Sequence, residues 1–125
     1  MRIAICDDEL QYRQLIHEKL LQDSICCDYE TEISEYESAA ELLAATEKGY
    51  SADVFFLDIQ MSGGEDGIWV GRELRRRGER GLIVYITGFI DYVQIGYEVR
   101  AFRYLLKGQI NESLPRVLGD IRREL

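Results

Sequence analysis

Acidic side chains follow two short apolar runs of the sequence, at the point where each run ends. Asp7 and Asp8 come directly after residues 3–6, and Asp58 directly follows residues 54–57. If these runs are neighbouring parallel strands, three carboxylates meet at one edge of a sheet. Two unit charges about 4 Å apart repel by roughly 4 kcal/mol at an effective dielectric constant near 20. Such a cluster must take up a proton or a cation, and an oxygen-only ligand set suits Mg²⁺ or Mn²⁺.

A hydroxyl and an ammonium group are expected at the same edge of the sheet. Thr87 ends the apolar run at 82–86, and Lys107 follows the run at 102–106. Taken singly, each residue has a simpler explanation. Thr87 could cap a strand end and Lys107 could be a surface lysine, while for Asp8 alone a helix cap explains the residue as well as a metal site does. Together these residues supply a carboxylate nucleophile, a cation site and donors for phosphoryl oxygens, so the constellation indicates phosphoryl transfer.

The four apolar runs predict buried strands, because they are short and rich in β-branched and aromatic residues. A fifth segment, at 27–34, alternates instead, which predicts an edge strand with one solvent-exposed face. Its inward side would carry Cys27, Tyr29, Thr31 and Ile33.

Helical patterns separate the strands. Asp8 is a possible first cap, Ser38 and Glu41 form an S-x-x-E capping box, and Pro115 fits only a first turn because it lacks a backbone donor. We predict helices at about 9–21, from Ser38 to near Gly49, at about 66–77 before Gly78, at about 91–99, and from near Ser113 or Leu114 to the end.

Strands and helices thus alternate five times, which predicts an α/β fold with a parallel sheet between two helical layers. Placing the alternating strand at an edge favours the strand order 2-1-3-4-5. In such sheets the ligand site lies beyond the carboxyl ends of the strands, where the order reverses. That point, between the first and third strands, is where the three carboxylates are predicted to meet.

Composition narrows the classes of function. The chain has 125 residues, which suits one domain over 1–125, and its net charge of −8 argues against direct contact with nucleic acid. The basic run at 72–80 contains two glutamates and is interpreted as a solvated helix face. Cys6, Cys26 and Cys27 show no metal or disulfide spacing, and no segment resembles a signal or a membrane span, so we expect a cytoplasmic protein without membrane contact.

Other chemically interesting residues have simpler explanations. His17 is the only histidine, and a surface or packing role fits it best. Trp69 is interpreted as helix packing or a surface contact. Gly63, Gly64 and Gly67 lack the spacing of a phosphate-binding loop and are expected to shape the loop around the acids.

The chain resembles the receiver domain of two-component response regulators over essentially all of its length. The matching motifs are I-C-D-D-E at 5–9, F-L-D-I-Q-M at 56–61, D-G at 66–67, I-T-G at 86–88 and Y-L-L-K at 104–107. The stretch at 96–107 is further similar to receivers that precede LytTR-type DNA-binding domains. Gly108 and Ser62 stand where the family commonly has proline, and the loop from Asp58 to Gly67 looks one residue longer.

The resemblance implies a flavodoxin-like (βα)5 fold and a role for each matching residue. Asp58 would be the phosphoacceptor, with Mg²⁺ held by Asp7, Asp8, Asp58 itself and the backbone carbonyl of Gln60. Thr87 and Lys107 would contact the phosphoryl oxygens. A sensor histidine kinase would be the phosphodonor, and the domain would catalyse only its own phosphorylation and dephosphorylation.

The resemblance also implies a switch, in which Thr87 moves toward the phosphoryl group and Tyr104 fills the vacated space. The surface of the fourth helix, fifth strand and fifth helix would change shape and control homodimerisation or an attached effector. We expect that effector to be a LytTR-type DNA-binding domain, from which this receiver was excised, so that DNA contact and control of transcription belong to the missing part.

Two other functions are compatible with parts of the pattern. A haloacid-dehalogenase-type phosphatase also uses a strand-end aspartate, but its second acid would stand where the sequence has Gln60. A flavodoxin-like binding module that no longer accepts phosphate would not need Asp7, Asp8, Asp58, Thr87 and Lys107 together.

Overall fold

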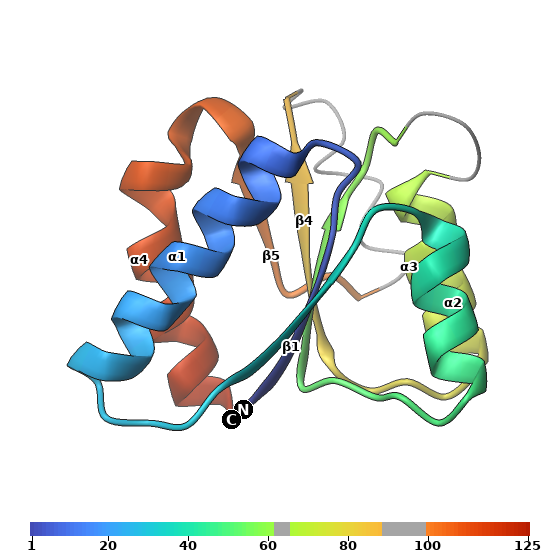
Figure 1. Cartoon of the computed structure of the whole chain (residues 1–125), viewed down its shortest axis with the longest axis horizontal. Coiled ribbons are helices and arrows are strands. Elements are labelled where there is room, and N and C mark those ends of the chain that lie inside the picture. The colour runs from blue at the N-terminus through green and yellow to red at the C-terminus, as the bar shows by residue number, and fades with distance from the viewer. Residues whose placement is uncertain (62–65, 89–99) are drawn as a thin grey trace.

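The structure is a computed structural model that describes residues 1–61, 66–88 and 100–125. A five-stranded sheet lies between two layers of helices (Figure 1). The strands are β1 (Arg2–Cys6), β2 (Glu32–Tyr36), β3 (Val54–Asp58), β4 (Leu82–Thr87) and β5 (Arg103–Leu106). The helices are α1 (Leu10–Cys26), α2 (Ala39–Glu47), α3 (Gly67–Arg76), the 3₁₀ helix η2 (Lys107–Gln109) and α4 (Ile110–Glu124). The helix predicted at 91–99 falls outside the described residues.

The strands pair in the order β2-β1-β3-β4-β5, and all four pairings are parallel. This confirms the predicted α/β class, strand order and flavodoxin-like layering. The register places Cys6 beside Leu57, and Asp58 beside Ile86. The carboxyl ends of β1, β3 and β4 therefore lie together at one edge of the sheet.

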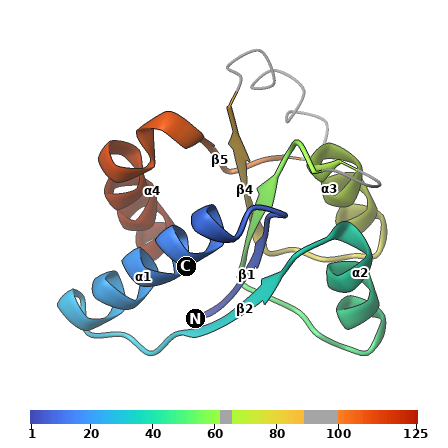
Figure 2. The ribbon, with the colours of Figure 1, turned by 45° about the horizontal axis from the view of Figure 1, so that its top comes forward.

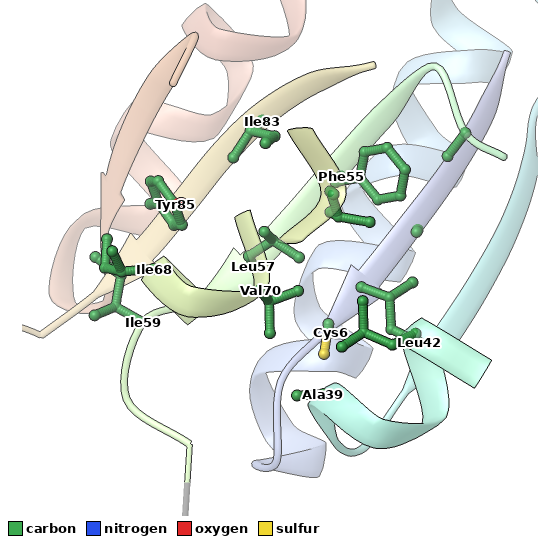
Figure 3. Close-up of a cluster of buried hydrophobic side chains, with 14 residues drawn as sticks. Cys6, Ala39, Leu42, Phe55, Leu57, Ile59, Ile68, Val70, Ile83 and Tyr85 are labelled. Carbon is green, nitrogen blue, oxygen red and sulfur yellow. The ribbon is translucent and has the colours of Figure 1, made fainter. Parts of the chain in front are cut away.

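In the described part of the chain, two helices cover each face of the sheet. In Figures 1 and 2, α1 and α4 lie on one side and α2 and α3 on the other. Alternate strand residues follow this division: Phe55 and Leu57 pack against α2 and α3, whereas Val54 and Phe56 pack against α1 and α4. Figure 3 shows the first of these clusters, in which Leu42 and Val70 meet the strand residues. Burial on both faces explains why the central strands read as continuous apolar runs.

The predicted boundary between the first helix and the second strand was wrong. α1 continues to Cys26, five residues beyond the expected end, and β2 begins only at Glu32. Residues 27–31 form the connection, in which Asp28 has a φ of 54°. The last turn of α1 is stabilised by contacts from elsewhere, since Asp23 pairs with Arg122 of α4. The edge position of β2 is confirmed.

The start of the last helix was also predicted wrongly. α4 begins at Ile110, directly after η2, and Pro115 lies inside it. The missing N–H of Pro115 leaves the carbonyl of Asn111 without its helical donor. Asn111 is exposed, so water can satisfy that carbonyl. Burial of Ile110 in line with Leu114 favours the earlier start.

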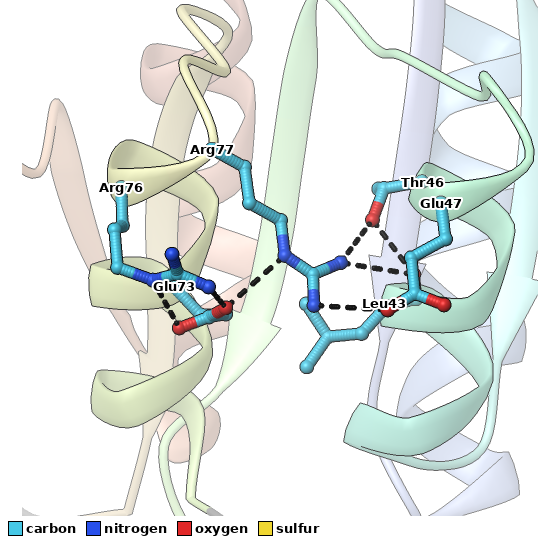
Figure 4. A network of polar contacts seen from close by, with 6 residues as sticks. All are labelled: Leu43, Thr46, Glu47, Glu73, Arg76 and Arg77. Carbon is cyan, nitrogen blue, oxygen red and sulfur yellow. Dashed lines mark hydrogen bonds and ion pairs between the residues drawn. The ribbon is translucent and has the colours of Figure 1, made fainter.

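The basic run at 72–80 does more than face solvent. Arg77 caps α3 and reaches across to the end of α2, where its guanidinium donates to the Leu43 carbonyl (3.2 Å) and the Thr46 hydroxyl (3.1 Å) (Figure 4). The same group pairs with Glu47 at 3.3 Å and with Glu73 at 3.1 Å. Arg77 therefore ties the two helices of this layer together.

None of the described helices is both long enough and apolar enough to cross a membrane.

Candidate functional site

Four carboxylates gather at the carboxyl ends of β1 and β3. Asp7, Asp8, Glu9 and Asp58 each offer one oxygen, and these oxygens all lie within 4.8 Å of one another. Asp7 and Asp58 are fully buried, whereas Asp8 is half-buried and Glu9 is exposed. The structure thus brings Asp7, Asp8 and Asp58 together, as predicted from the strand ends. Sequence reasoning did not single out Glu9, although its position directly after two aspartates was an available signal.

Backbone hydrogen bonds orient the two buried carboxylates. Oδ1 of Asp7 accepts from the N–H of Glu9 at 2.8 Å, and Oδ1 of Asp58 accepts from the N–H of Gln60 at 3.2 Å. The possible capping role of Asp8 is not confirmed, because the N-cap residue of α1 is Glu9, whose side chain makes no capping hydrogen bond. Because each Oδ1 accepts a backbone hydrogen bond, the Oδ2 atoms of Asp7 and Asp58 remain to interact with a cation in the space between the carboxylates.

Lys107 reaches that space from the end of β5. Its Nζ lies 2.8 Å from Oε1 of Glu9, 3.2 Å from Oδ2 of Asp58 and 3.6 Å from Oδ2 of Asp7. It also sits 4.5 Å from the ring centroid of Tyr12. A single cation thus partly offsets three acids.

The charges of the cluster shift one another's protonation. Burial, followed by the nearby Asp7 carboxylate, raises the pKa of Asp58 to about 8. Burial likewise raises the pKa of Asp7, against the opposing hydrogen bond from Glu9 and the charge of Lys107. Burial would lower the pKa of Lys107, but its acidic neighbours outweigh burial and raise it. Without a further cation, Asp58 therefore retains a proton around neutral pH.

The cluster has the properties of a site for a hard divalent cation. Oδ2 of Asp7 is buried and accepts no hydrogen bond within the described part of the chain. The ammonium of Lys107 lies 3.6 Å from this oxygen, farther than from Glu9 and Asp58. Oxygen ligands at this density, with no histidine or cysteine among them, suit Mg²⁺ or Mn²⁺. The residues present fit such an ion.

The remaining predicted residues lie around the same edge. Thr87 is fully buried as the last residue of β4, beside Leu106 in the register. Tyr104 pairs with Tyr85 across β4 and β5, and their rings lie 5.8 Å apart at 31°. Gln60 is exposed just after β3. The structure thus shows where Thr87, Tyr104 and Gln60 lie, whereas their roles in metal binding, phosphoryl transfer and switching remain predictions.

Gly67 closes the loop beneath Asp58. A Cβ atom at this position would lie 2.2 Å from the carbonyl oxygen of Asp58, so no other residue fits without a backbone shift. The Gly67 N–H donates to the Ile59 carbonyl at 2.9 Å, and Asp66 caps α3 by accepting from Trp69. The D-G pair at 66–67 therefore starts a helix while its backbone contacts the acid site. Gly63 and Gly64 lie outside the described residues.

The residues given simpler explanations lie away from the cluster. Trp69 is 38% exposed on α3, in keeping with a surface role. His17 is partly exposed, and its Nδ1 lies 2.8 Å from Oε2 of Glu35, a partner that the sequence did not reveal. Gly108, which stands where the family commonly has proline, lies with Lys107 in η2. The described residues include no cis peptide bond.

Comparison with known proteins identifies the family. The family model described as "Response regulator receiver domain" matches residues 3–118. An uncharacterized response regulatory protein of Vibrio cholerae is 32% identical over an alignment of 102 residues, and the match covers 74% of this chain and 39% of that protein. Accessory gene regulator protein A of Staphylococcus aureus is 25% identical over an alignment of 130 residues including gaps, and the match covers 94% of this chain and 51% of the relative. The chain thus spans about half or less of these relatives.

Solved structures give the same result. The response regulator TrrA of Thermotoga maritima, crystallised in complex with Mg²⁺ and BeF, has a TM-score of 0.78 and 26% identity, covering 96% of this chain and 97% of its own. The REC domain of AraT from Geobacillus stearothermophilus has a TM-score of 0.79 and 26% identity, covering 98% and 93%. The chain belongs to the response regulator receiver domain family of two-component signalling.

Proposed function

We propose that this domain, over 1–125, accepts a phosphoryl group on Asp58 from a sensor histidine kinase, in a reaction that requires Mg²⁺ or Mn²⁺. The observation that supports this most is the convergence of four carboxylate oxygens within 4.8 Å, with Lys107 beside them. A purely structural role does not explain two fully buried aspartates at neighbouring strand ends, because burying such charges costs stability. A signalling phosphoacceptor needs this arrangement.

Asp7, Asp8, Asp58 and the backbone carbonyl of Gln60 would hold the metal ion. When bound, the ion offsets the negative charge of the carboxylates and of the incoming phosphoryl oxygens. Glu9 is a further candidate ligand, since its carboxylate lies within the same cluster.

Asp58 is the nucleophile in this proposal. A carboxylate oxygen of Asp58 bonds to phosphorus while the bond from phosphorus to the histidine nitrogen of the kinase breaks, and the electron pair stays on that nitrogen. The ammonium of Lys107, which now lies 3.2 Å from Oδ2 of Asp58, pairs with a phosphoryl oxygen of the product. The hydroxyl of Thr87 donates to another.

The output follows from movement of Thr87 and Tyr104. As the Thr87 hydroxyl turns toward the phosphoryl group, the Tyr104 ring moves into the space it leaves, and the surface around β5 and α4 changes. Such a change favours homodimerisation or release of an attached LytTR-type DNA-binding domain, and hence controls transcription. DNA contact belongs to that attached domain, and the receiver works in the cytoplasm without touching a membrane.

The test is phosphorylation of the purified chain by acetyl phosphate with Mg²⁺, followed by intact-protein mass spectrometry. The wild type is expected to gain one phosphoryl group, and Asp58→Asn none. Asp53→Asn is the matched control, because Asp53 accepts a hydrogen bond from Arg2 at the other end of β3. Equal labelling of the wild type and Asp58→Asn, or steady turnover of acetyl phosphate without a labelled protein, would overturn the proposal.

A further inference from the structure

Arg13 is a buried arginine directly behind the acid cluster. It lies on α1 and is only 6% exposed. Arginine is almost never this buried unless its charge is paired. Its ion pairs with Glu35 and Glu37, on and just after β2, account for its charge. Its position therefore calls for another explanation than neutralising the site.

The shortest contact of Arg13 is with the backbone of the site. Its Nη1 donates to the carbonyl oxygen of Asp7 at 2.6 Å, and this hydrogen bond is buried. On the opposite side of the same residue, the Asp7 N–H donates to the Tyr36 carbonyl at 3.1 Å. The peptide that joins Asp7 to Asp8 is thus held by a side chain, at the turn where β1 passes into α1.

Two acidic residues, one on β2 and one just after it, keep the guanidinium of Arg13 in place. Nε of Arg13 lies 3.3 Å from Oε1 of Glu35, and its Nη2 lies 3.5 Å from Oε1 of Glu37. The other carboxylate oxygen of Glu35 lies 2.8 Å from Nδ1 of His17. The planar guanidinium can satisfy several fixed acceptors at once, which a lysine ammonium cannot match.

We propose that Arg13 is a positioning residue, which fixes the Asp7–Asp8 turn so that both carboxylates face the divalent cation. The inference rests on the proposed function, because that function gives the divalent cation its role. Residues that orient metal ligands from behind commonly change metal affinity about 10- to 100-fold when they are mutated.

Charge and position make opposite predictions for Arg13. If its positive charge were what mattered, removing it would make the site more negative and strengthen Mg²⁺ binding. If Arg13 positions Asp7, removing it weakens Mg²⁺ binding despite the more favourable charge. The direction of the change therefore distinguishes the two roles.

The experiment measures the Mg²⁺ dissociation constant by calorimetry, without a phosphodonor, for the wild type, Arg13→Met, Arg13→Lys and Arg2→Met. Arg2 is the matched control, since it is half-exposed and pairs with Glu32 far from the cluster. We expect Arg13→Met to weaken binding about tenfold or more, Arg13→Lys to restore part of the loss through one donor to the Asp7 carbonyl, and Arg2→Met to change nothing. Unchanged or tighter binding by Arg13→Met overturns the inference.

Two further measurements separate this inference from folding defects and from the proposed function. If Arg13→Met does not fold, Arg13→Lys serves instead, because it keeps the positive charge and loses the planar guanidinium. It is expected to bind Mg²⁺ more weakly than the wild type, and unchanged binding would overturn the inference. In a folded Arg13 variant, saturating Mg²⁺ should return the phosphorylation rate close to that of the wild type. If the wild type binds Mg²⁺ but takes no phosphoryl group, the proposed function fails while the role of Arg13 stands. If it binds no Mg²⁺, both fail.

Discussion

The ammonium of Lys107 lies 3.2 Å from the buried Oδ2 of Asp58, although 49 residues separate them in the sequence. β4 lies between the strands that carry these two residues, so the contact forms only because β3 and β5 end at the same edge of the sheet. The same ammonium also contacts Glu9, at 2.8 Å. Among the described residues, Lys107 thus supplies a positive charge that pairs with Asp7, Glu9 and Asp58 of the acid cluster.

Replacing Lys107 should separate metal binding from phosphoryl transfer. Lys107→Met removes a positive charge that competes with a metal ion, so Mg²⁺ should bind more tightly. The same change removes a donor for the phosphoryl oxygens, so phosphorylation by acetyl phosphate should slow by about a hundredfold or more. Calorimetry measures the first effect and mass spectrometry over time the second. Lys48→Met, at the exposed end of α2, serves as control. Parallel losses of both properties would show that Lys107 acts only by holding the fold.

The stability of the metal-free domain should fall as the pH rises. Folding raises the pKa of Asp58 from 3.8 to about 8, so between these values the native state binds a proton that the unfolded state has released. The free energy of unfolding therefore decreases with increasing pH over that window. Mg²⁺ binds the ionised cluster, so its stabilising effect should grow over the same window.

Urea unfolding at pH 5 and pH 8, in EDTA and in excess Mg²⁺, measures both trends. Asp58→Asn cannot ionise at this position, and it should flatten the pH dependence in EDTA. A metal-free wild type that becomes more stable between pH 5 and pH 8 would contradict the raised pKa of the cluster.

Gly67 should tolerate no side chain, whereas Gly119 should accept one. Gly67→Ala places a Cβ 2.2 Å from the Asp58 carbonyl oxygen, and we expect it to cost about 1–3 kcal/mol of unfolding free energy and to weaken Mg²⁺ binding. Gly119 lies within α4 and has only arginine side chains near its added Cβ, at 3.6 Å or more. Gly119→Ala should therefore stabilise the protein by about 0.5–1 kcal/mol. Thermal and urea melts measure both changes, and equal effects of the two substitutions would show that the close contact between Gly67 and the Asp58 carbonyl does not limit the side chain at this position.

The strand order and the acid cluster could be predicted because their signals are local. Asp7, Asp8 and Asp58 each end an apolar run, and the topology of a parallel sheet then brings these ends together. The alternating pattern around Ile33 placed its strand at the sheet edge, where β2 lies. Thr87 and Lys107 were placed at the same edge by the same reasoning.

The parts that could not be predicted depend on contacts between distant residues. The last turn of α1 pairs Asp23 with Arg122, which is 99 residues away, and no helix signal near Leu21 reveals it. Arg13 finds its partners on and after β2, so its role behind Asp7 has no sequence signature. Pro115 suggested a helix start, but burial of Ile110 outweighed the loss of one backbone hydrogen bond.

Tyr104 should matter for the response to phosphorylation and not for phosphorylation itself. Its half-buried ring lies on β5 against the fully buried Tyr85. The acid cluster consists of other residues, so Tyr104→Ala removes none of its carboxylates. We expect this variant to gain the phosphoryl group at the wild-type rate and to lose phosphorylation-dependent dimerisation, measured by analytical ultracentrifugation with beryllofluoride and Mg²⁺. Tyr104→Phe keeps the ring and should dimerise normally. Dimerisation of Tyr104→Ala to the wild-type extent would show that the ring does not transmit the signal.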